Sequence, residues 1–310
     1  MFEPSDGKRN ERGFILIVVL LLAALLALIA VGFTRSAQSF IRISAQGIDS
    51  ARAEALADSG VTFAVLDLIT RRQGAGRNGR FGVDGEPSTC SAGEDGVVEI
   101  RVQDTGGRIN LNLANEALLR ALFVGLGAES EQAARYADTI LDFRDRDDDR
   151  RLYGAELPEY RAAGRALGPK NAPFDTLEEL DQVLGLAPGM IAAMRPHVTI
   201  HSASAGLDPR AVRPELVELL RRGRSEGVFV PSQFNARGSG LPAEFVISSD
   251  QRNFVVRSEA RLASGAVFVR DAVIELPASA AASYRIRVWQ RGTADAGRRG
   301  EAIDATAPPC

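Results

Sequence analysis

The chain has 310 residues, of which 45% are hydrophobic and 25% are charged, and its formal charge at pH 7 is -3. This composition excludes a disordered polymer and a strongly basic nucleic-acid coat, and the length allows one large domain or two ordinary ones. Two cysteines and two histidines are too few for a disulfide-dense mini-fold or a Cys-rich zinc site.

Residues 14–34 form an apolar segment of 21 residues without a charge. As a helix this segment would be about 31 Å long, which is the thickness of a bilayer core. A buried soluble helix is rarely so apolar on every side, and the apolar region of a secretory signal peptide is shorter. The sequence therefore predicts a membrane span, and Lys8, Arg9 and Arg12 predict that the N-terminal end stays in the cytoplasm.

A helical pattern continues beyond this span. No proline occurs between Thr34 and Arg72, and apolar residues recur at steps of three and four or their sums. We therefore predict one helix of roughly 55 residues, whose second half lies on a soluble domain and in which Gly32, Gly47 and Gly60 are soft points. The apolar stripe on one face of this helix consists of Phe33, Ala37, Phe40, Ile48, Ala51, Ala55, Thr62, Leu66 and Ile69.

The N-terminal region resembles that of type IV pilins and pseudopilins. A short polar leader ends in Arg12-Gly13 and is followed by Phe14, an apolar run and an amphipathic continuation. The resemblance implies that a membrane aspartyl peptidase, the prepilin peptidase, cleaves between Gly13 and Phe14 on the cytoplasmic side. Most members of the class carry glutamate as the fifth mature residue, whereas this chain has Val18. Lack of that glutamate is typical of the K component of type II secretion systems.

The remaining chain changes character along its length. Residues 73–96 are rich in glycine and polar residues and are expected to form a loop or hairpin region, and residues 97–104 alternate like a strand. Helical patterns dominate residues 109–227, and strand patterns return from residue 228, beginning with GVFVPSQF (227–234) and 244–250. The tail from Arg291 to Cys310 is expected to be disordered.

We therefore predict an α+β fold, in which a long N-terminal helix packs on an antiparallel, pilin-like sheet that is interrupted by an inserted all-α domain of the helix-hairpin-helix or SAM-like kind. The segments GGRINLNLANEALLRAL, ILDFRDRDDDRRLYGAE and YRIRVW resemble the K family. The expected parts are a cleaved leader (1–13), the transmembrane part of the helix (14–34), the amphipathic helix with the first strands (35–107), the inserted helical domain (108–227), the remaining strands (228–290) and the tail (291–310).

The densest charge cluster of the sequence has the spacing of a calcium loop. Four acidic residues occupy positions 1, 3, 5 and 12 of a twelve-residue loop, which are side-chain ligand positions of the EF-hand. These residues are Asp145, Asp147, Asp149 and Glu156. Alternating aspartates in a curled loop can converge hard oxygens on calcium, and the resemblance to the K family also implies calcium binding.

Two residues test how far this pattern follows the EF-hand. Leu152 falls at position 8, where an apolar residue commonly anchors the loop, whereas Arg150 occupies position 6, where the EF-hand has glycine. We therefore expect the backbone of the loop to depart from EF-hand geometry, with Asp142 and Asp148 as alternative ligands. The alternative is a solvated charge run that is neutralised by Arg144, Arg146, Arg150 and Arg151.

The helical block also resembles helix-hairpin-helix modules, with Gly125 and Gly127 before a helix. DNA-binding versions need backbone N–H groups at a phosphate and nearby basic residues. Residues 108–227 carry 16 basic and 19 acidic residues, and Glu129 and Glu131 follow the glycines directly. We therefore interpret the hairpin as a packing device and expect no nucleic-acid partner, with a membrane-anchored DNA-binding or DNA-uptake protein as the alternative.

The resemblance implies a structural role, as a minor pseudopilin at the tip of the type II secretion pseudopilus. It implies the minor pseudopilins I and J, the prepilin peptidase and inner-membrane lipid as partners, with the C-terminal domain in the periplasm. We expect no enzymatic activity, because no catalytic triad, phosphate-binding loop or pair of catalytic carboxylates stands out. A signal-anchored periplasmic binding domain is a further alternative. Whether Cys90 and Cys310 form a disulfide in an oxidising compartment stays open.

Overall fold

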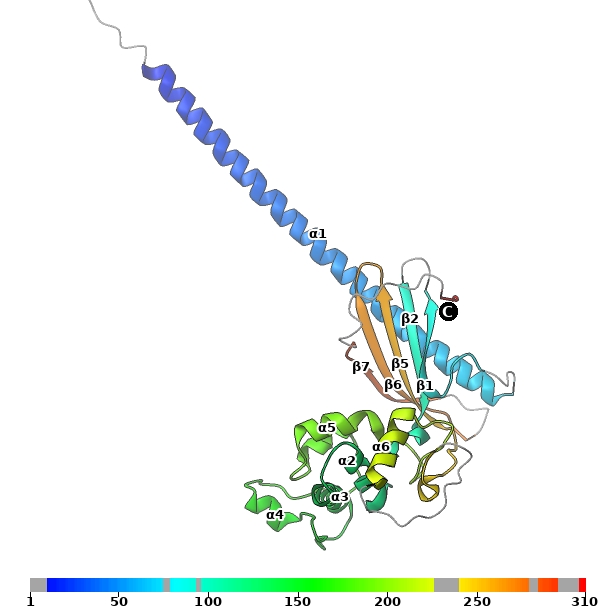
Figure 1. Ribbon diagram of the computed structural model, residues 1–310. Helices are drawn as coiled ribbons and strands as arrows, with labels where there is room; N and C mark the ends of the chain where they lie inside the picture. The colour runs from blue at the N-terminus through cyan, green and yellow to red at the C-terminus, as the bar shows by residue number, and fades with distance from the viewer. Residues whose placement is uncertain (1–9, 75–78, 93–95, 226–239, 279–283, 295–306) are drawn as a thin grey trace, which may run out of the picture.

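The computed structural model describes residues 10–74, 79–92, 96–225, 240–278, 284–294 and 307–310, with the backbone alone for residues 10–13, 33–43 and 224–225. Its longest element is the helix α1 (Asn10–Arg72). A single uninterrupted helix of 63 residues confirms the prediction of one long helix. Its segment Phe14–Gly32 is long and apolar enough to cross a membrane, and Figure 1 shows this half of α1 projecting away from the rest of the protein.

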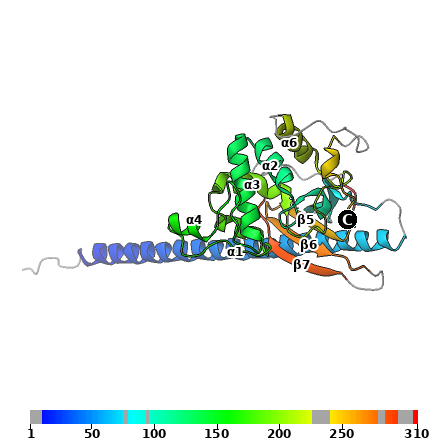
Figure 2. The same ribbon diagram turned by 90° about the horizontal axis from the view of Figure 1, so that it is seen from below.

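The second half of α1 packs on an antiparallel sheet of five strands. The strands are β1 (Asp84–Ser91), β2 (Gly96–Asp104), β5 (Asn253–Leu262), β6 (Val267–Glu275) and β7 (Arg285–Arg291). Their order in the sheet is β1-β2-β5-β6-β7, and each neighbouring pair is antiparallel. The helix lies against β2, β5 and β6 on one face (Figures 1 and 2). A long N-terminal helix on an antiparallel sheet is therefore confirmed.

Small side chains on α1 allow this close packing. Ala53, Ala57, Gly60 and Ala64 are buried against the sheet, where a glycine or alanine lets a helix approach the strands closely. Their partners include the buried side chains Val98, Ile100, Val102, Phe254, Val256 and Phe268. A Cβ atom at Gly60 would overlap with Ser258 of β5, so Gly60 is a close contact rather than a soft point.

The apolar stripe of α1 does not form this contact. Ile48 is exposed, and Leu66 keeps 61% of its surface accessible. In a helix with 3.6 residues per turn, the positions of Ile48 and Leu66 lie on the side opposite the buried face. Large apolar residues dominated the periodicity, whereas alanine and glycine form the buried face. Phe33, Ala37 and Phe40 lie outside the described side chains, and Ile69 is half-buried against the core.

A buried arginine of the sheet also forms ion pairs with α1. The Arg270 guanidinium on β6 donates to Asp58 of α1 at 2.6 Å and to Glu54 of α1 at 2.7 Å. The same group lies 4.9 Å from the ring centroids of Phe268 and Trp289. Charge pairing and stacking together fix the rotation of the helix about its own axis, because both acidic partners lie on one side of it.

The segment between β2 and β5 carries the remaining helices. They are α2 (Glu116–Gly125), α3 (Ser130–Arg144), α4 (Leu157–Ala162), α5 (Pro188–Met194) and α6 (Pro214–Ser225). They enclose an apolar core of their own, which includes Leu118, Leu122, Phe123, Ile140, Phe143 and Leu220.

The segment between β2 and β5 contains a pair of strands as well as helices, and one of its glycines has a packing role. A parallel pair joins β3 (Ile109–Asn110) to β4 (Val198–Thr199), so the segment is not helical throughout. A Cβ atom at Gly125 would overlap with the carbonyl of Leu219 on α6. This glycine therefore serves the close contact between α2 and α6.

The last strand patterns are confirmed in part. The patterns after residue 252 form β5, β6 and β7, but residues 244–250 form a short 3-10 turn at Ala243–Phe245 rather than a strand. The pattern at 227–234 lies outside the described residues.

The end of the chain is attached to β1. Cys90 and Cys310 form a disulfide, with their Cα atoms 5.0 Å apart. The Ser91 N–H donates to the Pro308 carbonyl at 2.8 Å, and the Cys310 N–H donates to the Ser91 carbonyl at 3.0 Å. The expectation of a disordered tail is therefore wrong for residues 291–294 and 307–310, and residues 295–306 lie outside the described part of the chain.

The two glycines of α1 allow a matched test of the helix–sheet contact. We expect Gly60→Leu to lower the free energy of unfolding by about 1–3 kcal/mol, because the added side chain must push α1 away from β5. At Gly47 no atom lies within 4 Å of a Cβ, so Gly47→Leu should leave stability unchanged or raise it by up to about 1 kcal/mol. Equal denaturation midpoints for the two variants in detergent would contradict this packing.

Candidate functional site

The acidic loop joins the end of α3 to the start of α4. Asp142 lies in the last turn of α3, and Glu156 directly precedes α4. Both side chains are buried, at 0% and 2% exposure. The fold therefore brings together two carboxylates that are 14 positions apart in the sequence, and it removes both from water.

Several oxygens of this loop are buried without a hydrogen-bond partner. They are Oδ1 of Asp142, Oδ1 of Asp145 and both carboxylate oxygens of Glu156, whose side chain faces the Glu159 N–H in a capping box without forming a hydrogen bond to it. The second oxygen of Asp142 accepts from the Arg151 N–H at 3.2 Å, and Gly154 lies so close to it that a Cβ atom there would overlap. Buried carboxylate oxygens without partners are costly and require compensation by a proton or a cation.

The electrostatics of the loop point the same way. Burial raises the pKa of Glu156 to about 7, with further contributions from Asp142, Asp145, Asp148 and Asp147. Burial also raises the pKa of Asp142 to about 6, and the N–H of Arg151 offsets this in part. The carboxylates therefore repel one another near neutral pH, and a cation among them would relieve the repulsion.

The neighbouring arginines neutralise only part of this charge. Arg151 lies 3.4 Å from Asp142 and 3.8 Å from Asp145, but it is exposed. Arg150 pairs with Glu159 at 3.3 Å, and Arg144 turns away to donate to the carbonyls of Leu111 and Ala114. Among the described residues, no basic side chain forms an ion pair with Glu156.

The loop does not follow the EF-hand. Asp147 and Asp149 are exposed, and the Asp149 N–H donates to Asp147 Oδ1 at 3.0 Å in a local turn. Leu152 is 77% exposed, so the expectation that it anchors the loop is wrong. No residue of the fully described stretch 145–156 has a positive φ, which agrees with arginine rather than glycine at position 150.

Asn171 contributes a further side-chain oxygen to the acidic loop, which the sequence pattern did not reveal. Its side chain donates to Asp148 Oδ1 at 2.8 Å, its N–H donates to the Phe143 carbonyl at 3.0 Å, and its own Oδ1 is buried without a partner. Its positive φ of 52° fits an asparagine. In the described part of the chain, no group of three or more His, Cys, Asp or Glu side chains is arranged so that it could hold a metal ion as it stands. Coordination would therefore require these side chains to move together.

A second candidate surface is the apolar stripe on α1. Ile48 and Leu66 of the stripe are exposed on the soluble half of the helix, with Ala51 and Ala55 exposed between them and Phe63 exposed beside the stripe. The exposed span Phe14–Gly32 continues the same helix, with Val18 inside it. Contiguous apolar surface of this kind indicates an interaction site for protein or lipid.

Known proteins resemble this chain in part of its sequence and in its fold. Residues 102–203, which include the acidic loop and Asn171, match the family model described as type II secretion system (T2SS), protein K. The chain is 30% identical over 183 residues to type II secretion system protein K of Pseudomonas aeruginosa (strain PAO1). This match covers 51% of the chain and 55% of the length of the Pseudomonas aeruginosa protein.

A solved structure extends the likeness to most of the chain. The GspK-GspI-GspJ complex from the type 2 secretion system of enterotoxigenic Escherichia coli contains a chain that aligns with a TM-score of 0.54 at 19% identity. The alignment covers 84% of this chain and 99% of that one, and it shows a shared fold. The matches in sequence and fold confirm the resemblance indicated by the N-terminal region: the chain is similar to protein K of type II secretion systems.

Proposed function

We propose that the chain is a minor pseudopilin of a type II secretion system, with a structural rather than catalytic role in the export of folded proteins. The observation that carries this proposal is α1, which is free of the sheet in its first half and leaves an apolar stripe exposed in its second half. A helix of this kind can anchor in a membrane and then pack against the helices of other subunits. The matches to protein K support the assignment.

We further propose that the soluble part lies in the periplasm and that the prepilin peptidase cleaves between Gly13 and Phe14. Lys8, Arg9 and Arg12 before the span favour a cytoplasmic N-terminus in the inner membrane. The disulfide between Cys90 and Cys310 fits an oxidising compartment.

A position at the tip of the pseudopilus agrees with Val18. In a filament, a glutamate at this place can pair with the N-terminal ammonium of the neighbouring subunit in an apolar setting, where an unpaired charge is costly. A subunit with nothing above it does not need that carboxylate. The helical segment between β2 and β5 is also more easily accommodated at the end of a filament than in its middle.

The partners follow from the exposed helix surface. The related Escherichia coli structure is a complex with GspI and GspJ, and we propose that the equivalent minor pseudopilins pack against the apolar stripe of this chain. Both large exposed residues of the stripe, Ile48 and Leu66, would then be buried between helices.

Lysine substitutions test this contact. We expect Ile48→Lys with Leu66→Lys to lower the affinity for the co-expressed partners at least about tenfold, because an unpaired charge would be buried in the contact. Gln46→Lys is the matched control, since Gln46 is exposed on the other side of the same helix. The melting temperature of the isolated protein should not change. Retention of both partners by the double variant in affinity purification would refute the proposed contact.

We also propose that the acidic loop binds calcium in a structural role. Asp142, Asp145 and Glu156 supply the buried oxygens without partners, and Asn171 supplies a neutral oxygen of the kind that calcium accepts. Asp147, Asp148 and Asp149 stay candidate ligands from the sequence spacing. Bound at this place, the ion would neutralise the loop and tie the end of α3 to the start of α4.

Calcium should therefore stabilise the fold. At a free concentration of one hundred times its dissociation constant, the ion adds about 2.7 kcal/mol to the free energy of unfolding. We expect a chelator to lower the melting temperature, calcium to restore it and magnesium to restore it poorly, because magnesium demands a tighter octahedral geometry. Glu156→Gln and Asp142→Asn should remove the calcium response, and Glu131→Gln, which removes an exposed carboxylate of α3 outside the loop, should retain it. Identical wild-type melting curves in chelator and in calcium would disprove the site.

The metal-free protein should also show a defined pH dependence. The pKa of Glu156 rises from 4.5 to about 7, and that of Asp142 from 3.8 to about 6, so the folded protein holds these protons more tightly than the unfolded chain. Their stabilising contribution is therefore complete below about pH 4 and is lost as the pH rises toward about 7. In chelator, wild type should lose more stability than Glu156→Gln between about pH 5 and 7.5. Parallel stability curves for the two proteins would show that Glu156 does not titrate in this range.

A further inference from the structure

One edge of the sheet is covered by the end of the chain, and the other is unpaired in the described part of the chain. Residues 307–310 lie beside the outer edge of β1, where they bond to Ser91 and are held by the disulfide to Cys90. The opposite edge is β7, and no strand in the described part of the chain pairs with its outer side. Unpaired strand edges readily accept another strand, and proteins usually cover them.

The backbone of β7 leaves two residues open to pairing. The Gly292 N–H donates to the Val269 carbonyl at 2.9 Å, and the register pairs Gln290 with Asp271. Because N–H groups alternate in direction along an antiparallel strand, Gly292 and Gln290 bond toward β6. Trp289 and Arg291 therefore direct their N–H and carbonyl groups toward the open edge.

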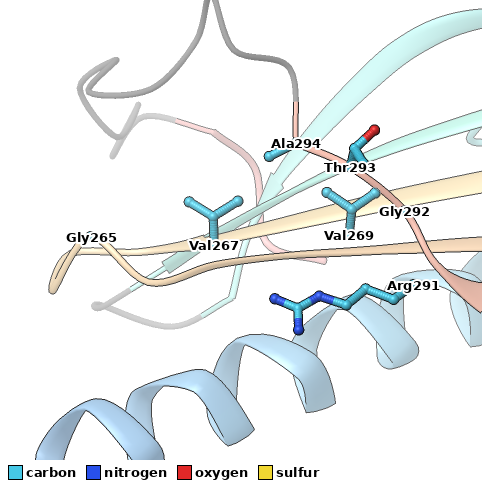
Figure 3. A pocket seen from close by; sticks show the side chains of 7 residues that line it. All are labelled: Gly265, Val267, Val269, Arg291, Gly292, Thr293 and Ala294. Atoms are coloured by element: carbon cyan, nitrogen blue, oxygen red, sulfur yellow. The ribbon is translucent and has the colours of Figure 1, made fainter. Parts of the chain in front are cut away.

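The side chains of β7 are unusual for a free edge. Ile286 is exposed, and Trp289, which is the only tryptophan of the chain, is 40% exposed, because α1 packs on β2, β5 and β6 instead. Ile286 pairs with Ile274 of the core under α1, so both exposed apolar residues lie on the helix side of the sheet. Figure 3 shows that Arg291 also turns toward α1, whereas Val269 points to the other side.

This edge also carries positive charge that the chain compensates only in part. Of its three arginines, Arg287 pairs with Glu275 at 2.6 Å. Within the described residues, Arg285 and Arg291 have no carboxylate partner, and Arg291 lies 5.0 Å over the ring of Phe268. Arg285 pairs in register with Glu275 and lies on the face away from α1. The edge therefore offers apolar surface on one face and cationic groups on both.

We propose that β7 binds an extended segment of a partner protein as an additional strand, and that this segment alternates apolar and acidic residues. Its backbone would bond to the free groups of Trp289 and Arg291, and its apolar side chains would cover Ile286 and Trp289. Its acidic side chains would lie on the opposite face beside Arg285, because successive residues of a strand point to opposite faces. This inference does not depend on the proposed secretion role or on the partners of the apolar stripe.

The test uses the full-length protein in detergent with a capped eight-residue peptide of alternating valine and glutamate. We expect saturable changes in Trp289 fluorescence and slower hydrogen exchange at the Trp289 and Arg291 amides. The Gln290 amide is an internal control, because it already bonds to β6 and should not change. A peptide of alternating valine and lysine should have no effect on the wild type, and Arg285→Glu should reverse the preference between the two peptides, because Arg285 lies on the face that receives the charged side chains.

Four results would overturn the proposal. The first is that neither peptide changes the exchange of these two amides, and the second is that both peptides change it equally. The third is protection of both amides in the dilute free protein, which would mean that another segment of the chain occupies the edge. The fourth is protection that increases with protein concentration, which would mean that a second copy occupies it. The circular dichroism of the Arg285→Glu variant must match that of the wild type, and Arg285→Gln provides a milder variant if it does not.

Discussion

The close contact between the small-residue face of α1 and the sheet determines which side chains of α1 are buried and which stay exposed. Ala57, Gly60 and Ala64 let the helix lie directly on β2, β5 and β6, and Arg270 fixes its rotation through Glu54 and Asp58. The large apolar residues of α1 are consequently left on the outside. A helix that used Ile48 and Leu66 to hold the sheet would have no apolar surface left for other helices.

The sequence predicted the elements of the fold better than their contacts. Length, charge and the absence of proline were sufficient for α1, and alternation was sufficient for β5, β6 and β7. The buried face of α1 was missed because alanine and glycine contribute little to a hydrophobic pattern, although they decide how closely elements approach. The attachment of Cys310 to β1 was not decided by the sequence, because it joins residues 220 positions apart in an otherwise polar tail.

In the acidic loop, too, the sequence predicted some of the residues but not the contacts that bring others to the site. Spacing alone identified Asp145 and Glu156, which the fold brings to one place, and it assigned equal weight to Asp147 and Asp149, which are exposed. The burial of Asp142 depends on how α3 packs, and the approach of Asn171 depends on a contact with Asp148 from outside the loop. Neither of these is a property of a local pattern, so a ligand set read from spacing could only be provisional.

The proposal that this chain is a pilin-class subunit makes a direct statement about its first residue in the cell. The decisive measurement is the N-terminal sequence of the protein isolated from membranes of cells that also contain the prepilin peptidase. The account predicts a mature chain that starts at Phe14, and accumulation of the uncleaved chain when Gly13 is replaced by a bulky charged residue. A mature chain that starts at Met1, or beyond residue 30 as after signal-peptide cleavage, would contradict the account, because the apolar half of α1 would then be either unprocessed or removed.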